Sequence, residues 1–180
     1  MVIEQATTDE FFKSMIDEAT SNKDMDEDTL FYIMSLLSSA THSTTFLDCG
    51  PDNLMQKPLA FMLKDALEAD PYVKYQKLKT LGDFTLVFGG FFREYLNRPR
   101  RSDLRDYYDT IGSTAYSSLT DLVVSTKHHP KRIFYELSER FVDYRGLIEE
   151  ISVSTRPYTK KSISAIVKRY IEDKQDWLGL

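Results

Sequence analysis

The chain has 180 residues, of which 42% are hydrophobic and 13% aromatic, and this composition excludes an intrinsically disordered protein. Its formal net charge of -5 argues against a dedicated nucleic-acid-binding domain, because such domains carry a basic excess. The single cysteine, Cys49, cannot form an internal disulfide or a thiolate zinc cluster. No signal peptide and no stretch of roughly 18 apolar residues occurs, so we expect a cytoplasmic protein without a membrane span.

Apolar residues at helical spacing begin near the N-terminus. Thr8 is a suitable cap for a helix over 9–19, and Asp26 for a second helix over 27–40. Residues 41–57 lack this spacing and are expected to form an irregular loop.

The middle of the chain predicts two further helices. Pro58 suits the first position of a helix over 58–69, and Asp70-Pro71 ends it and begins the next. This fourth helix is expected to run from Pro71 to about residue 96, followed by a turn over 97–101.

The remaining residues predict three more helices. Ser102 can cap a fifth helix whose apolar stripe reaches Leu122. His129-Pro130 begins a sixth, which carries one continuous stripe from Phe134 to Ile151 and is expected to end at Arg156-Pro157. Thr159 can cap a seventh helix, and strand alternation is absent.

These patterns predict an all-α fold, a single-domain bundle of about six to eight helices over residues 1–180. Within it, residues 1–28 form an acidic N-terminal helix and connection, 58–152 form the core, and 159–180 form a C-terminal helix.

The most distinctive segment is 81–116, where aromatic residues line one helix face and Gly82, Gly89 and Gly90 share the same helix. Glycine weakens a helix by about 1 kcal/mol relative to alanine, which suggests that another backbone or a ligand comes close. Two interpretations stay open, a tightly packed core with a satisfied polar contact or an aromatic-lined pocket for a flat or apolar ligand. The candidate pocket residues are Asp83, Phe84, Phe88, Phe91, Tyr95, Tyr108 and Tyr116.

The sequence gives little support for a catalytic or metal-binding motif. Asp24, Asp26 and Asp28 imitate the start of a calcium loop but lack its glycine and final glutamate. No histidine stands three residues after a glutamate, as a di-iron bundle requires, so we expect no metal centre and no cofactor. Asp106 and Asp109 form a weak version of a magnesium-diphosphate motif, which keeps an enzyme as a third hypothesis.

Charge is distributed unevenly. Residues 1–28 hold nine acidic and two basic side chains. Arginine forks suit carboxylates and phosphates, so the arginines before the fifth helix are a weak candidate anion site. These are Arg98, Arg100, Arg101 and Arg105. A second basic group is Lys127, Lys131 and Arg132, and the acidic N-terminus is expected to fold back against one of the two groups.

Several short motifs resemble a pattern in uncharacterised bacterial helical proteins. They are L-G-D at 81–83, G-F-F at 90–92, D-Y-Y at 106–108 and G-x-x-A-Y at 112–116. F-Y-E-L-S-E-R-F at 134–141 and L-I-E-E-I-S ending at Ser152 fit the same pattern. The resemblance covers roughly 58–152 and implies a compact all-α unit of bacterial origin, without an implied activity, cofactor or partner.

The sequence favours a non-enzymatic protein that acts through an unidentified protein partner or as a homodimer. The acidic first helix, with Phe11, Phe12, Met15 and Ile16 on its apolar side, is the candidate docking element. The alternative is a bundle that binds a small apolar or aromatic ligand between the fourth and fifth helices.

Overall fold

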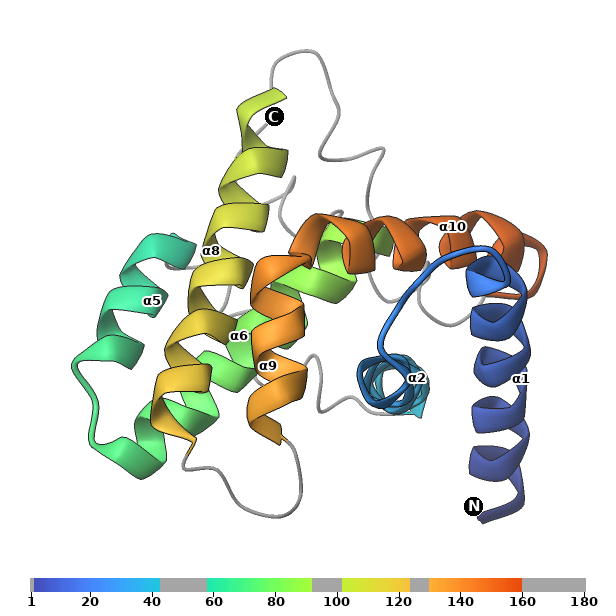
Figure 1. Ribbon diagram of the computed structural model, residues 1–180, viewed down its shortest axis with the longest axis horizontal. Helices are drawn as coiled ribbons and strands as arrows, with labels where there is room; N and C mark the ends of the chain where they lie inside the picture. Colours follow the sequence, from blue (N-terminus) through green and yellow to red (C-terminus); the bar gives the residue numbers. More distant parts are fainter. Residues whose placement is uncertain (1, 43–57, 92–101, 124–129, 160–180) are drawn as a thin grey trace, which may run out of the picture.

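The computed structural model describes residues 2–42, 58–91, 102–123 and 130–159, which form seven helices and no strand (Figure 1). The helices are α1 (Val2–Thr20), α2 (Glu27–His42), α5 (Leu59–Leu67), α6 (Pro71–Phe91), α8 (Ser102–Leu122), α9 (Pro130–Glu139) and α10 (Phe141–Thr159). The all-α fold predicted from the sequence is confirmed for these ranges. None of these helices is both long and apolar enough to cross a membrane.

Helix α6 is the central element of the bundle. It packs most extensively on α8 and also contacts α5 and α10. Most of its second half is buried on all sides, from Leu78 and Leu81 through Gly90. The predicted aromatic stripe is therefore only one of its buried faces, and Phe84 and Phe91 on that stripe are only partly buried.

The predicted sixth helix is in fact two helices that meet at Arg140, and the prediction of one continuous helix was wrong. The carbonyl of Arg140 accepts hydrogen bonds from the amides of Asp143 and Tyr144 and so begins a new helix. The bend lets α9 pack on α8 while α10 crosses α6 (Figure 1). Both halves keep their apolar stripe in the core, with Phe134 and Phe141 each 2% exposed. Because the apolar stripe stays buried on both sides of the bend, its periodicity in the sequence does not reveal the bend.

Helices α1 and α2 form a pair at the edge of the molecule opposite α5 (Figure 1). The apolar side of α1 is used inside this chain, since Phe12 is 1% and Ile16 3% exposed. The suggestion that this apolar side docks a partner is thus corrected, because its two largest anchors already lie in the core. The polar side of α1 faces solvent.

Some predicted boundaries were also wrong. Helix α1 begins at Val2, so Thr8 lies within it rather than capping it, because no glycine or proline interrupts residues 2–8. Pro58 precedes α5 instead of starting it. Helix α10 continues through Pro157 to Thr159. A proline in the last turn costs little there, because the carbonyl it leaves unbonded belongs to the exposed Val153.

The start of α2 was predicted correctly. The Asp26 side chain accepts a 3.0 Å hydrogen bond from the amide of Thr29 and a 2.9 Å bond from its hydroxyl. This satisfies a free amide of the first turn, which is the role of an N-cap. The end of the predicted fourth helix beyond Phe91, the 97–101 turn and the C-terminal helix all lie outside the described residues.

Candidate functional site

The carboxylate of Asp83 lies in the interior of the bundle, on α6, and the residue is 5% exposed. The hydroxyls of Tyr32 from α2 and Tyr116 from α8 donate hydrogen bonds of 2.5 and 2.8 Å to its Oδ1. Nζ of Lys79, one turn earlier on α6, pairs with Oδ2 at 2.6 Å. A buried carboxylate requires such partners. One interpretation of the sequence was a core with a satisfied polar contact, and the partners found here are two tyrosines and a lysine.

Burial raises the pKa of Tyr116 well above its usual range, and the charge of Asp83 raises it further. The same two causes raise the pKa of Tyr32. Both phenols therefore stay protonated at neutral pH and act as donors. The ammonium of Lys79 also lies 5.1 Å from the centre of the Tyr32 ring. The network joins three helices and leaves Lys79 as its solvent-side member.

The other candidate pocket residues pack against one another. The rings of Phe84 and Phe88 stack with centroids 5.3 Å apart, and Phe88 stacks on Tyr108 at the same distance. Phe91 is partly buried against the core. Tyr95 lies outside the described residues. In the described part of this segment, aromatic rings rather than open space lie between α6 and α8.

The glycines of the segment allow close packing. A Cβ at Gly82 would lie 2.8 Å from the ring of Tyr116, and one at Gly90 would lie 2.5 Å from Ile148. A Cβ at Gly112 would lie 2.3 Å from the ring of Phe141. These distances are shorter than atoms can approach, so each glycine makes room for a side chain of the neighbouring helix. Of the two interpretations of these glycines, close helix packing is the one observed.

A second buried network centres on Arg145 of α10, which is 3% exposed. Its Nε donates a 2.7 Å hydrogen bond to Asp109 Oδ1 on α8, and an Nη lies 3.3 Å from Glu149. Its aliphatic stem fills the space beside Gly89. No motif in the sequence singled out this residue, and the only signal was an arginine next to buried positions of the α10 stripe, with Glu149 one turn later.

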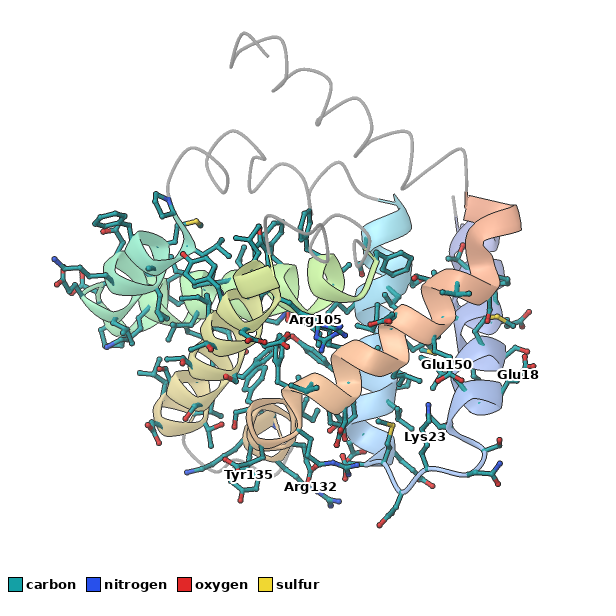
Figure 2. All side chains as sticks on the ribbon, turned by 90° about the horizontal axis from the view of Figure 1, so that it is seen from above. Glu18, Lys23, Arg105, Arg132, Tyr135 and Glu150 are labelled. Atoms are coloured by element: carbon teal, nitrogen blue, oxygen red, sulfur yellow. The ribbon has the colours of Figure 1, made fainter. Side chains whose placement is uncertain are left out.

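The predicted anion site is only partly described. Arg98, Arg100 and Arg101 lie outside the described residues. Arg105 lies between α8 and α10 (Figure 2), where it pairs with Glu149 at 3.0 Å. Its guanidinium is thus engaged by a carboxylate of this chain.

The two aspartates of the weak magnesium motif, Asp106 and Asp109, lie in different environments. Asp106 is exposed, whereas Asp109 is paired with Arg145. Burial raises the pKa of Asp109, and the guanidinium of Arg145 opposes this shift. Among the described residues, no group of three histidine, cysteine or acidic side chains is placed to hold a metal ion.

The acidic connection between α1 and α2 folds back against the second basic group, as the sequence suggested. Asp26 pairs with Arg132 of α9, and an Nη of Arg140 donates a 2.8 Å hydrogen bond to the carbonyl of Asp24. Lys23 and Glu150 form a third link at 2.5 Å, on the edge where α1 and α10 meet (Figure 2).

An open groove of about 420 Å³ lies at this junction. We call it the corner groove. Its polar walls include Asp24, Asp26, Glu27, Asp28, Arg132 and Arg140.

A second open cavity, of about 340 Å³, lies between α8 and the bend where α9 meets α10. We call it the α8 cavity. Its polar walls include Asp109, Thr110, Ser113, Ser138, Glu139 and Asp143. The sequence did not indicate it, because the bend at Arg140 brings its two walls together.

Comparisons of the chain with protein-family models, curated proteins and solved structures returned no match.

Proposed function

We propose that the protein is a non-enzymatic helical interaction module of the cytoplasm, and that its corner groove holds a basic segment of a partner protein. The partner segment is rich in lysine or arginine. The charges in the groove support this proposal most directly.

The arginines of the groove are already bound within the chain. Arg132 pairs with Asp26, and Arg140 pairs with Asp143 at 3.1 Å while donating to the carbonyl of Asp24. These contacts hold the acidic connection against α9 and α10. The groove is thus built on a scaffold that does not need a partner to form.

Three exposed carboxylates where the acidic connection enters α2 are unpaired among the described residues. Asp24, Glu27 and Asp28 are exposed and make no ion pair with any residue in the described ranges. Together with the surplus of acidic residues over 1–28, they give the groove a negative potential that attracts cationic groups and repels nucleic acid.

The alternative of an apolar ligand between α6 and α8 has less support, because Phe84, Phe88 and Tyr108 stack directly on one another there. Self-association remains a competing outcome of the test below.

Titration calorimetry with a short peptide of alternating lysine and glycine tests the proposal. The triple variant Asp24→Asn, Glu27→Gln, Asp28→Asn should weaken binding about tenfold or more, equivalent to about 1.4 kcal/mol. The matched control neutralises three exposed acids of α1, through Glu10→Gln, Asp17→Asn and Glu18→Gln, and gives the same change in net charge.

The control variant should bind nearly as well as the natural chain, and circular dichroism should report the same helix content for all three proteins. Equal weakening by both variants would mean non-specific charge attraction and would contradict the proposal. Light scattering that reports a dimer closed over the groove would do the same.

A further inference from the structure

The hydrogen-bond acceptors of the α8 cavity point to a ligand of a particular chemistry. Oδ1 of Asp109 accepts from Arg145, and Oδ2 has no hydrogen bond within the described residues. The Asp109 side chain is only 14% exposed, so this free oxygen belongs to a largely buried carboxylate on the wall of the cavity.

The two serine hydroxyls of the cavity both donate hydrogen bonds to backbone carbonyls. Ser113 Oγ donates to the carbonyl of Thr110 at 3.2 Å, and Ser138 Oγ donates to that of Tyr135 at 2.8 Å. A hydroxyl has one proton and two lone pairs, so both oxygens are left as acceptors. Glu139 adds an exposed carboxylate at the rim.

The two arginines at the cavity, one of which, Arg140, lies in its lining, are engaged by groups of this chain. Arg140 binds Asp143 and the carbonyl of Asp24, and Arg145 is shared between Asp109 and Glu149. The cavity therefore offers chiefly acceptors, and the three carboxylates in its lining outnumber its one arginine. The hydroxyl of Thr110, which makes no hydrogen bond within the described residues, can accept as well as donate. An ammonium group has three donors and no acceptor, which is the complement of this lining.

We propose that the α8 cavity binds a small organic ammonium ion, such as a diamine, with the ammonium group between Asp109, Ser113 and Ser138. Its volume of about 340 Å³ lies at the small end of the range for ligand pockets. In a diamine, a second ammonium group can reach Glu139 at the rim. The proposal does not depend on the corner groove or on a protein partner.

Titration of the full chain with 1,4-diaminobutane at about 20 mM salt, where charge attraction is little screened, tests the proposal. We expect saturable binding at one site. Tetramethylammonium, which has the charge without any N–H donor, should not bind. No saturable binding of the diamine, or equal binding of tetramethylammonium, would overturn the proposal.

Variants locate the site. Glu139→Gln and Ser113→Ala leave the ion pair between Asp109 and Arg145 intact and should each weaken binding about three- to tenfold, the range expected for losing one polar contact. Asp109→Asn should abolish it. Asp106→Asn, an exposed change on the same helix, and the triple corner-groove variant should leave the affinity unchanged, apart from a small uniform loss from the lower negative charge. An equal loss in Asp106→Asn and in Glu139→Gln would also overturn the proposal.

Discussion

Tyr116 of α8 donates a 2.8 Å hydrogen bond to Asp83 of α6 while its ring lies in the space left by Gly82. One side chain thus supplies both the packing and a polar partner at the centre of the bundle. The residue itself is fully buried. Because Tyr32 donates to the same carboxylate oxygen, α2 is tied to this centre as well.

Asp83→Ala should destabilise the protein by about 2–4 kcal/mol, because two buried hydroxyls, those of Tyr32 and Tyr116, lose their acceptor. Lys79→Met should cost only about 1 kcal/mol, because the lysine side chain is 34% exposed and water screens its charge. Chemical denaturation followed by circular dichroism measures both. A larger loss from Lys79→Met than from Asp83→Ala would show that the ion pair dominates the network.

Substitution of glycine by alanine should have opposite effects on stability at two positions of the chain. Gly112→Ala should destabilise by about 1–3 kcal/mol, because its Cβ would lie 2.3 Å from the buried ring of Phe141. Gly146→Ala should stabilise by about 0.5–1 kcal/mol, because no atom lies within 4 Å of its Cβ and alanine favours the helix. Thermal unfolding of the two variants compares them directly. A stabilising Gly112→Ala would contradict close packing of α8 on Phe141.

Arg145→Met should cost about 3–5 kcal/mol, because it leaves the largely buried carboxylate of Asp109 without its cation and Glu149 with Arg105 alone. The control is Lys23→Met, which breaks an ion pair whose side chains are 41% and 53% exposed and should cost less than about 1 kcal/mol. Denaturant midpoints at equal protein concentration measure the difference. Similar losses in the two variants would rule out a special role for the Arg145 network.

Alkaline pH should destabilise the fold through its buried tyrosines. The pKa of Tyr32, Tyr116 and Tyr144 is raised in the folded chain, chiefly by burial, so above pH 10 the unfolded chain loses these protons first. The folded state then binds more protons, and stability falls as pH rises, by about 1.4 kcal/mol per pH unit for each such tyrosine.

Tyr116→Phe should therefore reduce this slope by about 1.4 kcal/mol per pH unit, even though it lowers stability at neutral pH. Tyr72→Phe is the control, since that side chain is 76% exposed. Denaturation curves from pH 9 to 11 give the slopes. An unchanged slope in Tyr116→Phe would mean that its phenol titrates in the folded chain much as it does in the unfolded one.

The sequence by itself determined the helical class, the α2 cap at Asp26 and the buried stripe of α8. Local interactions decide these features, because side chains three or four residues apart on a helix face the same neighbour and a cap bonds an amide three residues away. Even the reason for Gly82 and Gly90 followed in outline, since glycine inside a helix indicates a close approach.

Only the tertiary structure decided which distant residues meet. The two tyrosine partners of Asp83 lie 51 and 33 residues away along the chain, and Arg145 is 36 residues from Asp109. The bend at Arg140, which forms one wall of the α8 cavity, leaves the periodicity of the α9–α10 stripe intact. Such pairings depend on how helices cross, and a crossing is set by the packing of whole faces rather than by any local pattern.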